Sequence, residues 1–189
     1  LFRSLPAGAL NVVTGLGEEA GSALTHHPGI DFVTFTGSPE VGTLVQKAAA
    51  ERTLKVVLEL GGKSPQVVFA DADLERATPF ILKAVTQNAG QTCSAGSRLL
   101  VQRRIHDEFV ARVAERFQAS RAGKPAMDLD CGPLINAAQK ARVEGFLQRA
   151  RGAGIPVLAQ GQVAPGVPAG GYYVDRKSTR LNSSHEWIS

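Results

Sequence analysis

Cys93 is the residue of this sequence whose setting best suits covalent chemistry. It lies in the segment 88–96, which reads NAGQTCSAG and holds few large apolar side chains. A cysteine that serves packing usually belongs to an apolar helix or strand, whereas a nucleophilic thiol needs an accessible setting. The commoner alternative is an inert cysteine, and that is how we interpret Cys131, which precedes Gly132 and Pro133. The loop therefore marks Cys93 as a candidate nucleophile.

A cysteine–histidine protease is the alternative chemistry for this thiol, and it would need a histidine partner. Three histidines lie at the ends of predicted helices without a local signature of such a site: His26, His27 and His106. A carboxylate is the other side chain that we consider together with Cys93. Glu59 lies at the carboxyl end of the predicted strand 54–60, and Leu60 separates it from two glycines.

Two glycine-rich turns could contact a phosphate-containing cofactor. The segment 15–21, GLGEEAG, follows a predicted strand and opens a predicted helix. It resembles a dinucleotide fingerprint with one residue too many before its last glycine. Gly15 and Gly21 would allow a tight turn and a close approach of the backbone to a phosphate. An ordinary glycine-rich turn is the alternative.

The second turn, FTGSPEVG at 35–42, lies at the carboxyl end of a predicted parallel strand, where open α/β sheets bind ligands. The free amides at the start of the next helix, together with the Ser38 hydroxyl, would suit a pyrophosphate. Gly42, one turn further on, removes a side chain that could block the ligand. The alternative is that Ser38 only caps its helix.

The predicted elements alternate in a way that is typical of α/β proteins. Strands are expected at 9–14, 31–35 and 54–60, with helices at 18–27 and 38–50 between them. This order implies a parallel, helix-covered sheet with right-handed crossovers. Beyond Gly61 and Gly62, the best internal boundary, further elements are expected: strands 66–69, 98–102 and 155–159, and helices 74–88, 105–121 and 136–151. Pro79 should distort the first turns of its helix. Asn136 can cap the last of these helices. The helix 105–121 has an apolar face, made up of Phe109, Val110, Val113 and Phe117.

Composition excludes several classes of protein. With 43% hydrophobic and 20% charged residues, the 189-residue chain can form a buried core, and no apolar stretch reaches the length of a membrane span. The net charge of +4 does not indicate nucleic-acid binding, because basic residues alternate with acidic ones, as along 107–121. Two cysteines and no Cys-x-x-Cys pair indicate no disulfide framework and no metal site. We expect a cytoplasmic protein without membrane or nucleic-acid partners.

The last fifteen residues differ from the rest. The segment 175–189, DRKSTRLNSSHEWIS, carries the only tryptophan and has neither helical nor strand periodicity. A native polar tail is the commoner origin of such an end. The abrupt change after GGYYV favours a non-native tail, which we leave out of the fold.

Four segments together resemble the NAD(P)-dependent aldehyde dehydrogenase superfamily over residues 5–174. They are LPAGALNVVTGLG (5–17), HHPGIDFVTFTGSPEVG (26–42), LELGGKSP (58–65) and NAGQTCSAGSR (88–98). The resemblance implies the end of a Rossmann-like parallel-sheet cofactor domain at 1–60, followed by the start of an α/β catalytic domain at 61–174. It makes Cys93 the nucleophile and Glu59 the base that activates water.

The same resemblance implies NAD or NADP as the cofactor and a small-molecule aldehyde as the substrate. The family's pyrophosphate-contacting glycine and serine correspond to Gly37 and Ser38, while Gly15 and Gly21 correspond to glycines near the adenosine end. The parent protein would be a homo-oligomer that oxidises an aldehyde to a carboxylic acid.

Family members are far longer than this chain. Their oxyanion-hole asparagine and the segment that chooses between NAD and NADP would precede Leu1, and the segment that holds the nicotinamide ribose would follow the chain. We therefore expect a truncated and by itself inactive chain. The alternatives are an inert or non-enzymatic module that retains the fold, and a relative that transfers the acyl group to coenzyme A.

Overall fold

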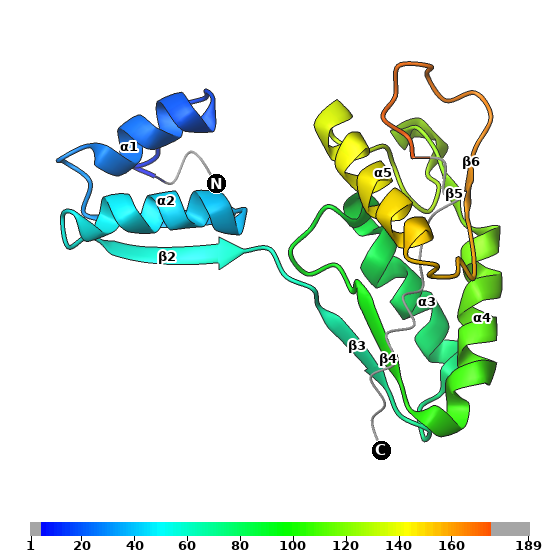
Figure 1. Cartoon of the computed structure of the whole chain (residues 1–189). Coiled ribbons are helices and arrows are strands. Elements are labelled where there is room, and N and C mark those ends of the chain that lie inside the picture. Colours follow the sequence, from blue (N-terminus) through cyan, green and yellow to red (C-terminus); the bar gives the residue numbers. More distant parts are fainter. Residues whose placement is uncertain (1–4, 175–189) are drawn as a thin grey trace. The chain divides into compact units, whose positions relative to one another are not determined.

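A computed structural model describes residues 5–174 of the chain. The chain divides between Gly61 and Gly62 into two compact units, each of which is described by itself (Figure 1). The assignment of these units to a cofactor domain and a catalytic domain stays a prediction, whereas their mixture of helices and parallel strands confirms the α/β class.

The first unit is built around one strand–helix–strand crossover. A π-helical turn η1 (Gly17–Gly21) and a short helix α1 (Ser22–His26) precede it. The crossover consists of β1 (Phe32–Gly37), α2 (Pro39–Ala50) and β2 (Lys55–Leu60). The two strands are parallel, with Phe32 opposite Lys55 and Gly37 opposite Leu60. A parallel pair requires such a crossover, and α2 provides it.

The two faces of the β1–β2 pair differ. Val33, Phe35, Val56, Leu58 and Leu60 are half-buried and share one face, because successive side chains in a strand alternate. Leu60 identifies this face as the one toward α2, since a Cβ on Gly42 would lie 2.6 Å from the Leu60 Cδ2. The residues of the opposite face, which include Glu59, are exposed.

The predicted strand at 9–14 is wrong, because these residues form turns and irregular backbone. Its apolar side chains are not buried, and Val12 and Val13 are each 80% exposed. A strand requires a neighbour to accept its ladder hydrogen bonds. Among the described strands, β1 and β2 pair only with each other.

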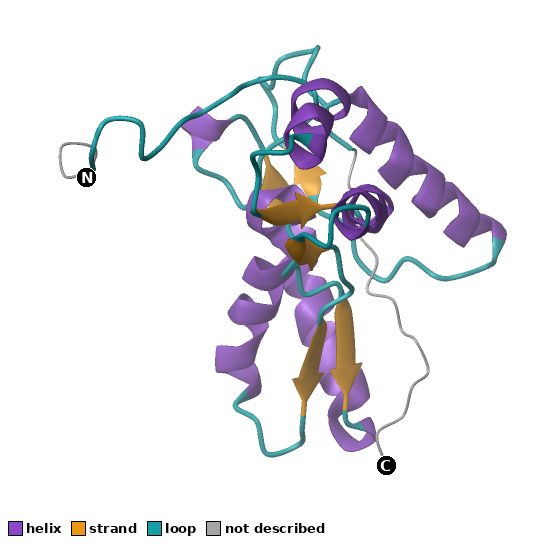
Figure 2. Ribbon diagram, turned by 90° about the vertical axis from the view of Figure 1, so that its left-hand side faces the viewer, coloured by secondary structure: helices purple, strands orange, loops and turns teal. Residues whose placement is uncertain are grey.

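The second unit contains two parallel pairs of strands and three longer helices (Figure 2). Its elements, in chain order, are β3 (Pro65–Val68), α3 (Leu74–Thr86), η2 (Gln87–Gly90), β4 (Arg98–Val101), η3 (Arg103–Ile105), α4 (His106–Ala119), β5 (Arg121–Ala122), η4 (Pro125–Met127), α5 (Ala137–Gly152) and β6 (Gln162–Val163). Strand β3 pairs with β4, and β5 pairs with β6. The predicted strand at 155–159 is wrong, since this segment is irregular. It contains Pro156, which has no N–H to donate to a ladder.

The core of the second unit lies where α3 and α4 meet β3 and β4. Phe109 and Val113 are completely buried on α4, and Phe117 of the next turn is nearly so. The apolar face predicted for this helix is therefore confirmed. The remaining buried members of this cluster are Val68, Ile81, Val101, Ile105 and Ala159.

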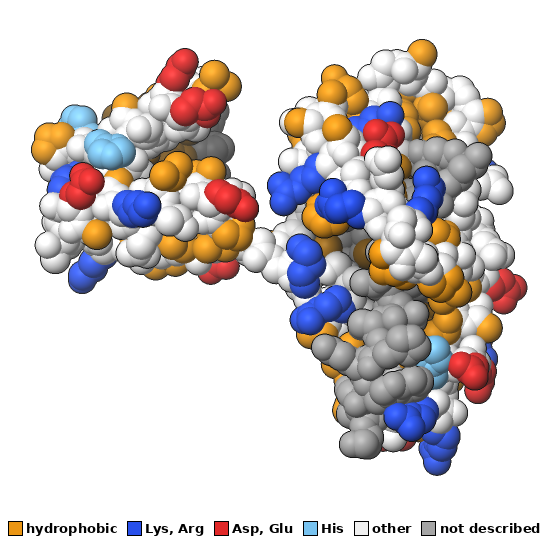
Figure 3. All heavy atoms as spheres, in the orientation of Figure 1, with side chains coloured by type: hydrophobic (Ala, Val, Ile, Leu, Met, Phe, Trp, Pro, Cys, Tyr) orange, Lys and Arg blue, Asp and Glu red, His pale blue; other side chains and the backbone are white. Residues whose placement is uncertain are grey.

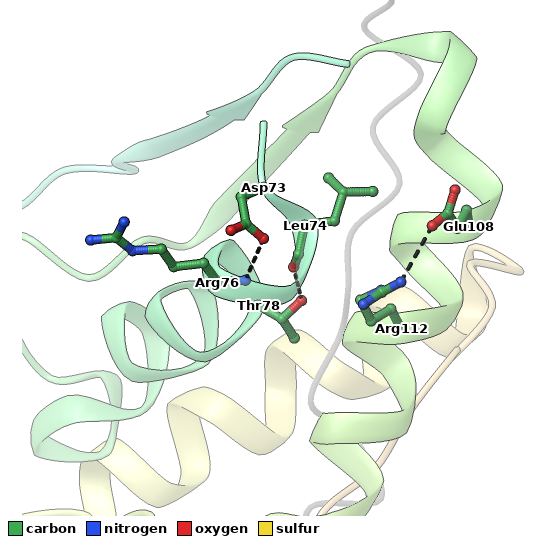
Figure 4. Close-up of polar contacts among 6 residues, drawn as sticks. All are labelled: Asp73, Leu74, Arg76, Thr78, Glu108 and Arg112. Carbon is green, nitrogen blue, oxygen red and sulfur yellow. Dashed lines mark hydrogen bonds and ion pairs between the residues drawn. The ribbon is translucent and has the colours of Figure 1, made fainter. Parts of the chain in front are cut away.

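Local hydrogen bonds explain where α3 begins (Figure 4). The carboxylate of Asp73 accepts from the backbone N–H of Arg76 at 3.0 Å, which caps the first turn. The buried Thr78 donates its hydroxyl to the Leu74 carbonyl at 2.7 Å. The segment stays helical from Leu74 to Thr86 across Pro79. On the neighbouring α4, Glu108 and Arg112 form an ion pair at 3.4 Å.

Candidate active site

Cys93 is exposed and lies in a turn between η2 and β4. Its carbonyl oxygen accepts a hydrogen bond of 3.4 Å from the Ser64 hydroxyl. Gly62 lies so close that an added Cβ would be 3.7 Å from the same oxygen. The segment 62–64, directly after the chain leaves β2, therefore lies against the backbone of the candidate nucleophile.

The carboxyl end of this loop is anchored to β3 and α3. The Gly96 N–H donates to the Ala84 carbonyl at 2.9 Å, and the Gly96 carbonyl accepts from the Gln66 side-chain amide at 2.8 Å. A Cβ on Gly96 would lie 2.5 Å from that amide, so a larger residue there would displace the Gln66 side chain. The Arg98 Nε donates to the Lys63 carbonyl at 2.7 Å. Sequence reasoning missed these anchors, because amide and guanidinium side chains carry no periodic pattern.

The amino-terminal side of the loop has an unusual backbone. Asn88, Ala89 and Gly90 have φ values of 48°, 55° and 76°, which places three consecutive residues in the left-handed region. Glycine adopts this region freely and asparagine tolerates it, whereas for alanine the Cβ makes it costly, by roughly 1–2 kcal/mol. The tertiary structure must therefore hold this turn in place.

Glu59 is exposed near the end of β2, opposite Thr36 of β1. It lies on the face of the strand pair that α2 does not cover, so its carboxylate is open to solvent or a ligand. Glu59 belongs to the first unit and Cys93 to the second. Their cooperation in one site stays a prediction.

The turn between β1 and α2 has the geometry of a helix cap. The Ser38 hydroxyl accepts from the Val41 N–H at 3.3 Å, and Pro39 occupies the first helical position. Gly37 precedes this cap at the carboxyl end of a parallel strand, and a Cβ there would lie 2.5 Å from the Phe35 ring. Gly42 is buried against Leu60. Its missing side chain therefore allows α2 to pack closely on β2, which is a reason different from the one inferred from the sequence.

The first glycine motif lacks the strand that a dinucleotide fingerprint requires, because residues 9–14 are irregular. Gly15 lies against the turn that follows, where an added Cβ would be 2.9 Å from the Ala20 Cβ. Gly21 is the last residue of η1, and a Cβ added there would have open space around it. The contact of Gly15 and Gly21 with a cofactor stays a prediction.

The side chains of His26, His27 and His106 each contact a group within their own segment. The His26 Nδ1 lies 2.8 Å from the Ser22 carbonyl, the His27 Nδ1 accepts from the Gly29 N–H, and the His106 Nδ1 lies 2.8 Å from the Asp107 carboxylate. None of these contacts involves Cys93. Cys131 is half-buried and lines an open cleft of about 740 Å³.

Across residues 5–174, no group of three or more His, Cys, Asp or Glu side chains could hold a metal ion. In the same range, no helix combines the length and the apolar character needed to cross a membrane.

Comparison with known proteins identifies the family. The sequence profile of the aldehyde dehydrogenase family matches residues 2–176, so the chain belongs to this family. An aldehyde dehydrogenase from Aspergillus niger is 46% identical over 160 residues, which cover 84% of this chain and 32% of that protein. The chain spans about a third of the length of the curated relatives it matches.

Solved structures have the same fold. A crystal structure from Burkholderia cenocepacia, assigned as an aldehyde dehydrogenase, is 57% identical in sequence and has a TM-score of 0.88. The match covers 90% of this chain and 36% of the Burkholderia chain. The structure of PnpE in complex with nicotinamide adenine dinucleotide is 37% identical in sequence and has a TM-score of 0.83. The match covers 91% of this chain and 36% of the PnpE chain. At these identities the likeness extends to the family as well as to the fold.

Proposed function

We propose that this chain forms part of an NAD(P)-dependent aldehyde dehydrogenase that oxidises a small aldehyde to a carboxylic acid, with Cys93 as the nucleophile. The observation that carries the proposal is the position of Cys93 on an exposed turn, in a chain that belongs to the aldehyde dehydrogenase family. Its thiol is exposed, while the loop around it is held by Ser64 and Gln66. Such a loop presents a thiol in a defined position.

The turn between β1 and α2 fits the pyrophosphate of a dinucleotide. Ser38 begins a twelve-residue helix at the carboxyl end of a parallel strand, where amides and the helix dipole favour an anion. Gly37 and Ser38 would contact the pyrophosphate, with Gly15 and Gly21 toward the adenosine. When bound, the cofactor would supply the acceptor for the hydride that the aldehyde carbon loses. The complex of PnpE with NAD supports this cofactor class.

The chain's own residues have separate tasks in the proposed reaction. The Cys93 thiolate attacks the aldehyde carbon, forming a C–S bond and an oxyanion to which the Cys93 backbone N–H can donate. Loss of hydride from the same carbon leaves a thioester on Cys93. Glu59 takes a proton from the water that attacks the thioester, the C–S bond breaks, and the acid leaves with the thiolate restored.

Two other functions predict different results. A relative that forms acyl-coenzyme A would produce NAD(P)H only when coenzyme A is present, and Glu59 favours hydrolysis instead. An inert or non-enzymatic module would form no aldehyde-dependent thioester at Cys93. Intact-protein mass spectrometry after the addition of aldehyde and NAD(P) detects that adduct.

The test uses a graft in which residues 5–174 replace the matching segment of the Burkholderia cenocepacia relative. We expect Cys93→Ser to lower aldehyde-dependent NAD(P)H production by about 10³-fold or more, because loss of a nucleophile removes the covalent route. Cys131→Ser is the matched control and should keep activity within about twofold, since it changes one half-buried thiol only. An active Cys93→Ser graft would contradict the proposal.

A further inference from the structure

Gln91 connects the left-handed turn before Cys93 to a second part of the same unit. Its side-chain oxygen accepts from the Ile135 N–H at 3.0 Å, and its side-chain nitrogen donates to the Asn88 carbonyl at 3.1 Å. The backbone N–H of Gln91 also donates to that carbonyl, at 3.0 Å. Because an N–H only donates and a carbonyl only accepts, these two partners define the orientation of the amide.

The contact with Asn88 closes the costly turn. Asn88, Ala89 and Gly90 all have positive φ values, and Ala89 has no intrinsic preference for this region. Two donors from one residue, Gln91, converge on the carbonyl at the start of this turn. They offset the backbone cost where the chain turns toward Cys93, two residues further on.

The contact with Ile135 fastens the turn to a segment that is itself anchored. Cys131 forms a β-bridge with the buried Ala122 of β5, and the Cys131 carbonyl accepts from the Gly123 N–H at 3.0 Å. The Leu134 N–H donates to the Tyr172 carbonyl, also at 3.0 Å. Gln91 and Ile135 both line the open cleft of about 740 Å³. The loop of Cys93 is thus attached on this side through the Gln91 side chain.

We propose that Gln91 is a positioning residue that sets the backbone of the nucleophile loop from its amino-terminal side. Ser64, Gln66 and Arg98 hold the opposite side, so removal of Gln91 frees one end of the loop without unfolding the unit. The use of the positioned thiol in aldehyde oxidation rests on the proposed function. The attachment of the loop through Gln91 is independent of the proposed function.

The first measurement is hydrogen exchange of the Ile135 amide in the 189-residue chain at high dilution. Gln91→Met keeps the length of the side chain and removes both hydrogen bonds, so we expect exchange about two- to tenfold faster. Gln91→Glu keeps an acceptor for Ile135 and loses the donor to Asn88, so protection of Ile135 should remain. Gln102→Met is the matched control, because the Gln102 oxygen accepts from the Ala70 N–H at 2.7 Å. It removes the same kind of contact elsewhere in the unit.

The second measurement is the kinetics of the graft. Gln91→Met should lower kcat about tenfold with KM nearly unchanged, because the thiol is misplaced while the substrate surfaces remain. Gln91→Glu should restore part of kcat, and Gln102→Met should change neither constant. Unchanged Ile135 exchange in Gln91→Met, or an equal kcat loss in Gln102→Met, would overturn the proposal. An inactive wild-type graft would contradict the proposed function, and Ile135 exchange would still decide the role of Gln91.

Discussion

At the scale of single residues, the two candidate catalytic groups differ in how they are held. Glu59 lies on a regular strand, where the register with Thr36 sets its position. Cys93 lies on irregular backbone and depends on hydrogen bonds from Ser64, Gln66 and Gln91 to nearby parts of the loop. Changes near Cys93 should therefore affect the geometry of attack, whereas changes at Glu59 should affect proton transfer.

Replacement of Glu59 by Gln in the graft should slow the release of acid more than the formation of the thioester. An amide cannot take the proton of the attacking water, so NAD(P)H should appear in a burst followed by a slow steady state, reduced by about 10²- to 10⁴-fold. Stopped-flow absorbance measures both phases. Glu51→Gln, an exposed residue just after α2, is the control and should show wild-type kinetics. Loss of the burst itself would assign Glu59 to an earlier step.

At the scale of elements, helix α4 shows how an amphipathic pattern supports the site. Its buried residues meet α3 and the β3–β4 pair. The Ala84 carbonyl of α3 accepts from the Gly96 N–H, and the side chain of Gln66 on β3 donates to the Gly96 carbonyl. The core therefore supports the elements that hold the loop of Cys93.

Phe109→Ala in the 189-residue chain should destabilise the second unit by about 3–5 kcal/mol, because it leaves a cavity in a closely packed core. Phe146→Ala is the matched control. Phe146 is 56% exposed on α5, where Arg149 lies 4.4 Å from the centre of its ring, and its loss should cost about 1 kcal/mol or less. Hydrogen exchange of the amides of α3 and α4 measures both effects. Equal effects of the two variants would contradict the position of the core.

At the scale of the whole molecule, much apolar surface is uncovered. Within residues 5–174, each of the three sheets has two strands. The strands of the β1–β2 and β3–β4 pairs therefore each have an unpaired edge, whereas β5 has Cys131 bridged to its second side. Figure 3 shows apolar side chains on the visible surface of both units. Exposed large apolar residues include Val12, Phe32, Phe80 and Ile135. Large apolar side chains exposed in such number are characteristic of a surface that contacts further polypeptide.

The 189-residue chain should therefore bind the dye ANS under native conditions, with a fluorescence increase several times that of the graft. The physical reason is that the dye partitions into apolar surface that water otherwise contacts. Fluorescence titration at equal protein concentration measures the difference. A chain that binds no more dye than the graft would show that this surface is covered.

The sequence alone was sufficient to predict much of the local structure and the family of the chain. Apolar residues at helical spacing predicted the buried face of α4, Ser38 and Asn136 predicted helix starts, and β-branched runs predicted β1 and β2. These features depend on neighbours within a few residues, which a sequence displays directly. The segments around Glu59 and Cys93 were specific enough to indicate the aldehyde dehydrogenase family, which the profile match confirmed.

The tertiary structure alone decided what depends on distant partners. The β-prone segments 9–14 and 155–159 do not form strands, because strand formation requires a paired neighbour and Pro156 lacks a donor. Gly42 packs against Leu60 from 18 positions away, and Gln91 reaches Ile135 across 44 positions. Such contacts arise when the folded chain brings remote backbone groups within hydrogen-bonding distance, and no periodicity in the sequence records them.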